Sequence, residues 1–403
     1  MMERIRFLTA GESHGQALIT IIEGLPAGLA ITASDIAVDL RRRQRGHGRG
    51  GRMQIEQDRV RILSGVRYGK TLGSPLTLLL ENRDWPNWTQ KMAVEPVAQP
   101  APPLQRPRPG HADFAGMVKY RQEDLRNILE RSSARETAMR VAAGAVARQL
   151  LQIFRVTVWG HVTNIGGVES DFSAMSFFAG PKAYDSERLQ AWREIMAAVE
   201  ASPVACASPA PGDDMIRSID AAGKQGDSLG GTFEIVALGV PVGLGSHVHW
   251  DRRLDTHLAA ALMSIPAIKA IEFGMGHHVA FHPGSRIHDE IFFTAESGYY
   301  RGSNHAGGIE GGMSNGEAIV IRLSMKPLPT LVQPLRSLDV ATHEAQKAFS
   351  ERADICAVPA AVVVAEAMTA LVLANALYEK LGGDSLAEML EHFKDLVHVP
   401  LGW

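Results

Sequence analysis

The sequence predicts an α+β fold, a β-α-β sandwich with pseudo-duplicated halves in which helices are packed between antiparallel sheets. Two observations carry this prediction. A glycine-rich turn followed by an apolar strand occurs four times, twice in each half of the chain, and helix signals lie between these copies. Strands that alternate with buried helices favour such layers. All 403 residues are predicted to form one domain, with related halves at about 1–155 and 215–380.

The repeated turn has the pattern Gly-x-Ser/Thr-x-Gly and begins at Gly11, Gly69, Gly226 and Gly312. The first and third copies agree with each other at seven of nineteen positions, which indicates related halves. Their spacing is too irregular for a solenoid. An apolar run follows each copy, so we expect strands at 17–22, 76–80, 233–238 and 318–323.

Capping patterns locate two helices between the strands. Thr32 and Asp35 form a capping box, and the helix after them is expected to reach about Gln44, with Gly46 as its stop. Ser133 with Glu136 forms a second box, and its helix should run to about Phe154.

Two more helices are expected nearer the C-terminus, one over about 252–263 and one through the apolar residues 357–378. Pro359, Glu366 and Asn375 interrupt the second run, which therefore indicates a buried helix and not a membrane span. The proline-rich residues 93–109 are expected to be extended and mobile, and residues 200–214 are expected to be similar.

Bulk composition narrows the function classes. The chain carries a formal net charge of −3, which argues against a general nucleic-acid binder because such domains are usually basic. Cys206 and Cys356 give no disulfide framework and suit a reducing compartment. The N-terminus lacks the long apolar run of a signal peptide, so we expect a cytoplasmic protein with no membrane partner.

Against this acidic background, six arginines and four glycines fall within residues 41–52. Arg41, Arg42 and Arg43 are expected to close a helix, where cations are favourable. Arg45, Arg49 and Arg52 lie in the glycine loop beyond it, and that helix does not explain them. Guanidinium groups pair bidentately with carboxylate and phosphate, so the sequence predicts an anion-binding loop.

Two other segments combine cations with constrained backbone. Arg108 and His111 lie in a loop that two prolines stiffen, which fits either a site or a purely structural turn. Arg131 and Ser132 precede the second capped helix, whose free N–H groups can hold an anion. Arg135 in the first turn opposes the helix dipole, which suggests that an anion compensates it.

Three familiar motifs are rejected. Gly-x-Ser-x-Gly marks the nucleophile of serine hydrolases, but there a helix follows the turn, whereas here a strand is expected after each copy. Gly65–Thr71 resembles a P-loop but has three residues between its glycines where four are needed. The histidines at 277, 278, 282 and 288, and the pair at 247 and 249, lack metalloprotease spacing, and no metal site is predicted.

Six motifs, in order along residues 3 to about 380, resemble those of chorismate synthase. They are Gly11–Gly15, Arg41–Met53, Arg108–Asp113, Leu129–Thr137, Gly308–Gly316 and Lys326–Thr330. The resemblance implies a lyase of the shikimate pathway for aromatic amino acid biosynthesis. Such an enzyme converts 5-enolpyruvylshikimate 3-phosphate to chorismate and phosphate by 1,4-anti elimination. It requires reduced FMN, with NADPH as indirect reductant, although there is no net redox change.

The resemblance also implies site residues. Proton-transferring or catalytic roles fall to His14, His111 and Asp354. Substrate contacts fall to Ser13, Arg43, Arg49, Arg52, Arg108 and Arg135. Flavin contacts fall to Arg131, Ser132, Ser133, Pro266, Ala267, Gly311, Lys326, Pro327, Leu328, Pro329, Thr330 and Arg352. Which arginines hold substrate and which hold flavin phosphate stays open.

A homotetramer is the assembly that the resemblance implies. There is no added reductase domain in the sequence, so a separate flavin reductase is the expected partner. One departure is Ala353, where the family usually has serine before the acidic residue, and the change removes at most one hydrogen bond beside Asp354. His47 replaces a common tyrosine and is expected to be a mild change.

Two alternatives belong to other functional classes. An RNA-binding protein using the arginine-glycine loop predicts salt-sensitive binding, but aromatic side chains for base stacking are scarce around that loop. A flavin oxidoreductase with net redox chemistry would consume NADPH in proportion to product.

Overall fold

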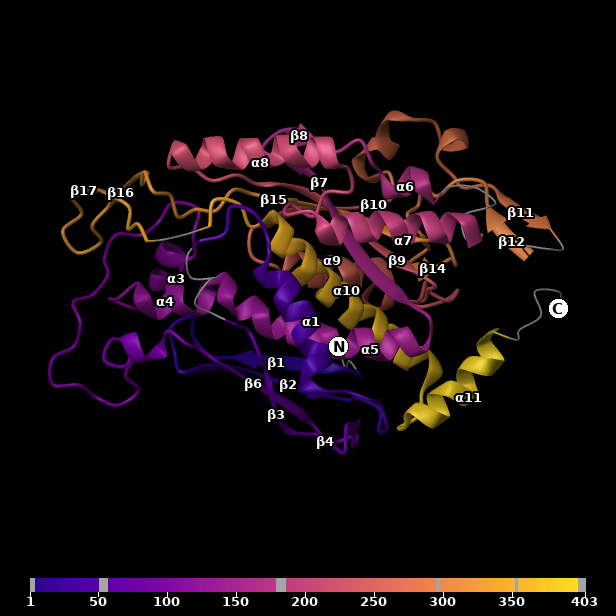
Figure 1. Ribbon diagram of the computed structural model, residues 1–403, viewed down its shortest axis with the longest axis horizontal. Coiled ribbons are helices and arrows are strands. Elements are labelled where there is room, and N and C mark those ends of the chain that lie inside the picture. Colours follow the sequence, from indigo (N-terminus) through magenta and orange to yellow (C-terminus); the bar gives the residue numbers. More distant parts are fainter. Residues whose placement is uncertain (1–3, 51–56, 179–185, 295–297, 352–353, 398–403) are drawn as a thin grey trace.

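The structure, a computed structural model, describes residues 4–50, 57–178, 186–294, 298–351 and 354–397. Its elements form layers, with a group of helices between two antiparallel sheets (Figure 1). The combination of helices with antiparallel sheets confirms the predicted α+β class. Duplication of the two halves stays a prediction.

The first sheet is built from the N-terminal residues and buries one face. Leu18 and Ile22 on one strand, with Leu78 on its neighbour, are buried against the helices, whereas Leu8 and Ile21 are exposed on the outer face. This alternation is the period of two that a half-buried strand requires. The strand order is β1 (Arg6–Ala10), β2 (Ala17–Glu23), β6 (Leu76–Glu81) and β3 (Arg61–Ser64).

The second sheet has both faces covered. Along its central strand, Ile235 and Ala237 belong to the main hydrophobic core, whereas Val236 and Leu238 belong to a second cluster on the other face. This explains why the strand is a continuous apolar run. The order is β10 (Ile268–Phe273), β15 (Ile319–Met325), β9 (Gly231–Leu238), β7 (Thr157–Ile165) and β8 (Val168–Glu169).

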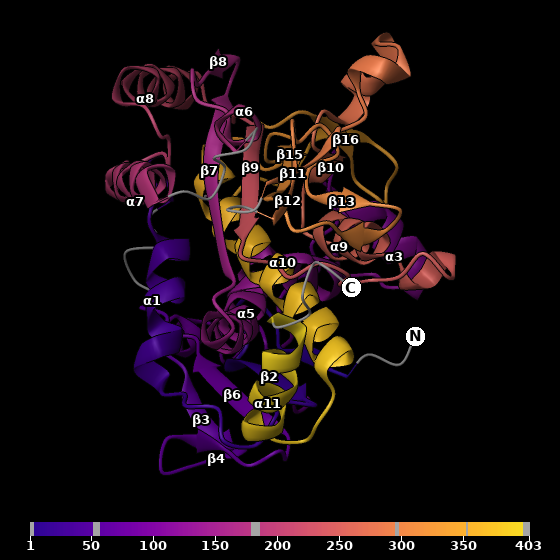
Figure 2. The ribbon, with the colours of Figure 1, turned by 90° about the vertical axis from the view of Figure 1, so that its right-hand side faces the viewer.

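Four helices fill the space between the sheets (Figures 1 and 2). They are α1 (Ala33–Gln44), α5 (Thr137–Ile153), α9 (Leu254–Met263) and α10 (Val358–Leu381). Helix α5 packs against the first sheet and against α10, which in turn packs on β7 and β9 of the second sheet. The outer face of the second sheet is covered by α7 (Ser186–Ala201), whose Trp192 and Met196 contact the second cluster.

The remaining elements lie around these layers. Along the chain, helix α6 (Ala174–Phe177) precedes α7, α8 (Pro209–Lys224) follows it, and α11 (Leu386–Val397) follows α10. Helices α3 (Asp113–Tyr120) and α4 (Arg126–Ser132) precede α5. Short 3-10 helices are η1 (Trp85–Asn87), η2 (Ala134–Glu136), η3 (Trp250–Arg252), η4 (Gly276–Phe281) and η5 (Gly284–Arg286). Four hairpins pair β4 (Val66–Arg67) with β5 (Lys70–Thr71), β11 (Ile291–Thr294) with β12 (Gly298–Arg301), β13 (Ile309–Glu310) with β14 (Met313–Ser314), and β16 (Arg336–Leu338) with β17 (Ala345–Lys347).

The four strands expected after the repeated turns are confirmed as β2, β6, β9 and β15. In three of these turns a hydroxyl group donates to a main-chain carbonyl oxygen, as Thr71 does to Pro26, Ser228 to Leu328 and Ser314 to Pro241. These hydroxyls therefore stabilise their turns. A strand follows each Gly-x-Ser-x-Gly copy, as the rejection of the hydrolase motif predicted.

Helix α1 begins at the predicted capping box on Thr32 and ends at Gln44 with three arginines in its last turn. The predicted apolar helix is α10, and its most apolar 18-residue stretch is 94% buried. By length and composition it alone, within the described ranges, is long and apolar enough to cross a membrane. Its burial makes it the central helix of the core, as the interrupting Glu366 and Asn375 indicated.

Two predictions need correction. Residues 200–214 are not one extended segment, because α7 reaches Ala201 and α8 begins at Pro209, where proline is tolerated in the first turn. Ser133 does not open the long helix directly. It caps the 3-10 turn η2, accepting from the Arg135 N–H, and α5 begins at Thr137.

Residues 93–109 contain no helix or strand, as predicted, and their mobility stays a prediction. The end of this segment is held in place, since Pro107 O accepts from Ser337 Oγ and Arg106 O accepts from the Phe349 N–H.

Candidate active site

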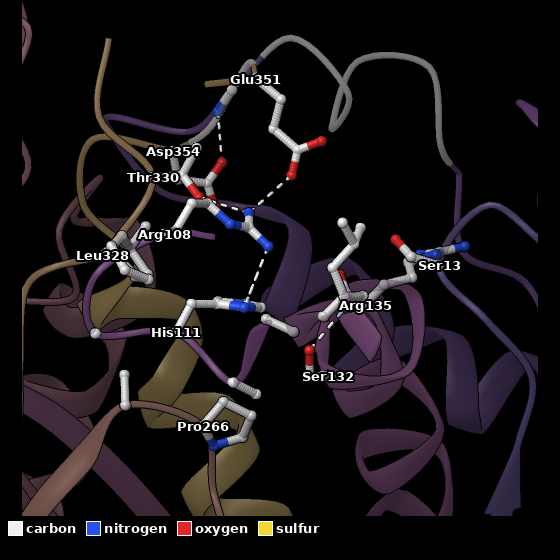
Figure 3. A pocket seen from close by; sticks show the side chains of 18 of the residues that line it. Ser13, Arg108, His111, Ser132, Arg135, Pro266, Leu328, Thr330, Glu351 and Asp354 are labelled. Atoms are coloured by element: carbon white, nitrogen blue, oxygen red, sulfur yellow. Dashed lines mark hydrogen bonds and ion pairs between the residues drawn. The ribbon is translucent and has the colours of Figure 1, made fainter. Parts of the chain in front are cut away.

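A cavity of about 420 Å³ opens where α1 ends and α5 begins, within the size range of small-molecule sites. In Figure 3, Arg108, His111 and Pro266 lie on one side of it and face Ser13, Ser132 and Arg135 on the other. The lining residues are Ser13, His14, Arg43, Arg49, Gly50, Arg108, Gly110, His111, Ala112, Leu129, Ser132, Ser133, Ala134, Arg135, Pro266, Ala267, Lys326, Leu328, Pro329, Thr330, Glu351 and Asp354.

A buried carboxylate, Asp58, organises two of the arginines. Its Oδ1 accepts from Arg135 Nη1 at 2.6 Å, and its Oδ2 lies 3.5 Å from Arg43 Nη1. Arg43 is further fixed by Thr137 Oγ1 and Ala134 O, and Arg135 by Asn82 Oδ1. The anion that Arg135 requires near a helix start is thus supplied, at least in part, by the chain itself.

The environment of Arg43 shows how costly this concentration of charge is. Its side chain is 4% exposed. Burial lowers the pKa of Arg43 to about 10, and although Asp58 opposes that shift, the neighbouring Arg49 and Arg135 guanidinium groups add to it. Arg43 remains charged at neutral pH. Three guanidinium groups this close together favour binding of an anion among them.

The arginine-glycine loop is joined to the segment before α10 through Asp354. One carboxylate oxygen accepts from the Gly50 N–H at 2.6 Å, and the other lies 3.1 Å from Arg49 Nη1. The Ile355 N–H donates to Gly48 O. Both oxygens of Asp354 therefore contact the loop, which fixes Arg49 at the cavity.

His111 is held by a second buried carboxylate. Its Nδ1 lies 2.5 Å from Asp113 Oδ1, and because the carboxylate can only accept, Nδ1 carries the hydrogen. Arg108 Nε donates to Asp113 Oδ2 at 2.9 Å, and Arg108 Nη1 donates to Thr330 and Glu351. Burial alone would raise the pKa of Asp113, but His111 and Arg108 outweigh it and hold that pKa well below its usual range.

His14 is held in a similar way on the opposite side. Its Nδ1 lies 2.8 Å from Glu130 Oε1, and its main-chain N–H donates to Glu130 Oε2 at 2.7 Å. The ring also stacks on Trp88, with centroids 3.9 Å apart and planes 20° apart. The cavity therefore has two histidines, each with one nitrogen bonded to a buried carboxylate.

Comparison with known proteins assigns this arrangement to a family. A sequence model described as "Chorismate synthase" matches residues 5–378. The chain belongs to the chorismate synthase family. It is 54% identical over 396 residues to the chorismate synthase of Symbiobacterium thermophilum, covering 97% of this chain and 98% of the relative. Identity to the chorismate synthase of Aquifex aeolicus is 53%, covering 98% of each.

The fold comparison agrees with the sequence comparison. A solved structure titled "Crystal Structure of Chorismate Synthase" superposes with a TM-score of 0.77 at 43% identity, covering 98% of this chain and 97% of that one.

Most residues singled out from the chorismate synthase motifs meet at this one cavity. Arg131, Gly311 and Pro327 do not line it. Arg131 donates to Thr9 O and Gly11 O, and Gly311 lies in the turn between β13 and β14. Arg52 and Arg352, like Ala353, lie outside the described residues.

Several residues that support the site were not identified from the sequence motifs. Asp58 follows the arginine loop, two positions after Glu56, and nothing in its sequence neighbourhood marks its pairing with Arg135. Asp113 lies two positions after His111 inside a recognised motif, and this short spacing is a signal that could have indicated its role. Glu130 also lies inside a motif, but its partner His14 is 116 positions away, so no local signal indicates their pairing. Glu351 lines the cavity without any such signal.

Two of the histidines outside the site pair with nearby carboxylates. His277 Nδ1 lies 2.5 Å from Glu272 Oε1, and His249 Nδ1 lies 2.6 Å from Asp251 Oδ1. Within the described part of the chain, no group of three His, Cys, Asp or Glu side chains is arranged to hold a metal ion.

Proposed function

We propose that this chain converts 5-enolpyruvylshikimate 3-phosphate to chorismate and phosphate by 1,4-anti elimination with reduced FMN, as a lyase of aromatic amino acid biosynthesis. Membership of the chorismate synthase family supports the reaction. The observation that carries it to this cavity is its charge. Among the described lining residues, five are arginine or lysine and only two are acidic, which suits a ligand bearing one phosphate and two carboxylates.

The residues also suit a flavin mononucleotide. Pro266, Ala267, Leu328 and Leu129 offer an apolar surface for a ring system. Lys326 offers a cationic donor for a phosphate, and Ser132, whose O–H donates to Ile128 O, offers an acceptor oxygen for a ribityl hydroxyl. When bound, reduced FMN would supply an electron transiently to the allylic system from which phosphate departs. Arg352, Arg131, Gly311 and Pro327 remain proposed flavin contacts on the resemblance alone.

The arginines have a positioning and electrostatic role in this proposal. Arg49 and Arg135, with Arg43 behind them and Ser13 beside them, would hold the substrate anions, and Arg52 would join them. At an effective dielectric of about 20, one such pair at 4 Å contributes roughly 4 kcal/mol before desolvation. The resemblance implies a substrate contact for Arg108. Its side chain already contacts Asp113, Thr330, Glu351 and His111, so we propose that it contributes by holding His111 and Thr330 in place.

Proton transfer is assigned to the two histidines and Asp354. His14 would donate a proton to the departing phosphate from Nε2, since Nδ1 bonds to Glu130. His111 would donate to or stabilise the reduced flavin. Asp354 would assist removal of the substrate proton, and the Arg49 and Gly50 contacts that now hold it would have to rearrange.

The assembly and supply of reductant are further parts of the proposal. We propose a cytoplasmic homotetramer that receives reduced flavin from a separate reductase, with NADPH as the indirect reductant. Size measurement of the purified protein, and its turnover with and without an added reductase, would test these two points.

The function is tested by an anaerobic assay with 5-enolpyruvylshikimate 3-phosphate and chemically reduced FMN, following chorismate absorbance and phosphate. Equal amounts of both products, formed only with reduced flavin, are expected. NADPH consumption in proportion to product would instead indicate net redox chemistry, and absence of chorismate would contradict the proposal.

A pair of loop variants ties the reaction to the cavity. Arg49→Gln should raise KM for the substrate at least tenfold, because it removes a charge-assisted contact of about 1.5–3 kcal/mol. Arg45→Gln is the matched control, since Arg45 is 66% exposed and lies outside the cavity lining. Equal KM values for the two variants would show that Arg49 does not contribute to substrate binding.

A further inference from the structure

We propose that Glu130 is the positioning residue for His14, holding the hydrogen on Nδ1 and the ring in one orientation, so that Nε2 is the atom that exchanges a proton at the cavity. The first part of this inference stands on geometry alone, and only its catalytic consequence rests on the proposed function.

Glu130 fastens the turn that carries His14 through three hydrogen bonds. Its two carboxylate oxygens accept from His14 Nδ1 and from the His14 N–H, and its main-chain carbonyl accepts from the Ser13 N–H at 3.0 Å. The side chain of Glu130 is 2% exposed. A buried ionised carboxylate has acceptors only, so the ring nitrogen that faces it must present a hydrogen.

Trp88 restrains the same ring from its face. The indole stacks on the imidazole, and its own Nε1 donates to Asp84 Oδ2 at 2.9 Å, which fixes the indole in turn. Glu130 acts in the plane of the imidazole ring and Trp88 acts perpendicular to it. Together they define the direction of the remaining nitrogen, as carboxylate partners do for histidines that must present one chosen nitrogen.

Glu130 does not line the cavity, whereas Ser13, His14 and Leu129 beside it do. It therefore acts through His14 and not on a ligand. The role of Glu130 differs from that of Asp58. Asp58 pairs with arginines and fixes the position of their charge, whereas Glu130 selects by its hydrogen bond which tautomer of His14 is populated.

Glu130→Gln tests this idea with almost no change of shape. The amide oxygen can still accept from one N–H group of residue 14, but the amide nitrogen must then face the other position as a donor. With oxygen kept on the main-chain N–H, Nδ1 has to accept, and the hydrogen moves to Nε2. A ring with hydrogens on both nitrogens would then place two donors against each other.

The first readout is the nitrogen NMR signature of the His14 ring in protein labelled with 15N at histidine, assigned by loss of the signal in His14→Gln. The wild-type protein should show a hydrogen on Nδ1, and Glu130→Gln should show Nδ1 without one. A wild-type ring whose Nδ1 carries no hydrogen overturns the proposal, even if the variant fails to fold.

The second readout is steady-state turnover with reduced FMN. Glu130→Gln should lower kcat by about 100-fold or more, in line with loss of a general acid, while KM changes less than about threefold. The matched control is Glu136→Gln, because Glu136 bonds to Thr9 and Arg140 and does not line the cavity. Near-normal kcat in Glu130→Gln, with the tautomer unchanged, also overturns the proposal.

The two readouts separate this inference from the proposed reaction. If wild-type protein makes no chorismate, the reaction is wrong, and the NMR result still decides the role of Glu130. If chorismate is made and the Nδ1 hydrogen persists in Glu130→Gln, the reaction stands and the positioning role is rejected.

Discussion

At the scale of single residues, buried acidic side chains hold the arginines and histidines of the cavity in place. Asp58 holds Arg135 and Arg43, Asp113 holds His111, and Glu130 holds His14. None of these three acids lines the cavity. The surface presented to a ligand is therefore cationic, while the charge that keeps those cations ordered is buried one layer deeper.

Asp113→Asn should show what such an acid contributes. Because His111 and Arg108 depress the pKa of Asp113, its ionised form is stabilised on folding. That stability is present above the ordinary aspartate pKa near 3.8 and is lost as pH falls below it. The variant should lose about 1.5–3 kcal/mol of unfolding free energy at pH 7. Its stability should also fall less steeply than wild type below about pH 4.

Urea unfolding from pH 7 down to pH 3 measures both effects. Unfolding free energies that coincide at pH 7 would show that Asp113 contributes nothing net. A parallel loss at every pH would instead mean that the lost hydrogen bonds matter and the charge does not.

At the scale of elements, the close approach of α5 and α10 is made possible by Gly144. A Cβ built there would lie 2.3 Å from Ala367 Cβ and 2.5 Å from its Cα. Alanine in a helix is favoured over glycine by roughly 1 kcal/mol, but overpacking costs about 1–3 kcal/mol, and here the clash involves backbone. Gly144→Ala should therefore destabilise the protein by about 1–2 kcal/mol, as thermal or urea unfolding would measure.

Gly223 in α8 provides the control for this crossing. A Cβ there would meet Ile355 Cδ1 at 2.5 Å, which is the far end of a flexible side chain that can move aside. Gly223→Ala should be neutral or slightly stabilising. Equal destabilisation by the two substitutions would show that the helix crossing does not determine the effect.

The same elements show what could be predicted from sequence. Strands after the repeated turns and the capped start of α1 follow from local patterns, and all were confirmed. Helix α8 was missed because Pro209 and Gly212 look like a loop until the chain context shows that proline occupies the first turn. The 3-10 turn before α5 was missed because Ser133 fits a cap equally well in either geometry.

For the site, motifs in the sequence identified the residues that line the cavity but not the residues that hold them in place. Motifs located His14, His111, Arg49 and Arg135, because their residue types and neighbours are distinctive. The partner of Arg135 is 77 positions away, at Asp58. Such pairing depends on how the first sheet and α5 are brought together, and no local pattern encodes it.

At the scale of the whole molecule, one buried acid joins the layers. Glu366, which is fully buried in α10, accepts from Arg42 of α1, Arg148 of α5 and the Gly160 N–H of β7. Arg42 also pairs with Glu200 of α7. Burial alone would raise the pKa of Glu366, but the two arginines lower it overall, so the carboxylate stays ionised.

Glu366→Gln should therefore reduce the stability of the entire fold. Removing the charge takes away one of the two carboxylates that Arg42 and Arg148 share, since Asp39 still pairs with both. Breaking a buried ion pair costs about 3–5 kcal/mol, and with Asp39 in place we expect a loss near the lower end of that range. Glu23→Gln is the matched control, because the Arg6–Glu23 pair is 70% and 49% exposed and such pairs contribute about 1 kcal/mol or less. Urea unfolding followed by circular dichroism compares the two variants. If Glu366→Gln loses no more than Glu23→Gln, the buried cluster adds no net stability, and its role would be confined to orienting α1 and the arginine loop that follows it.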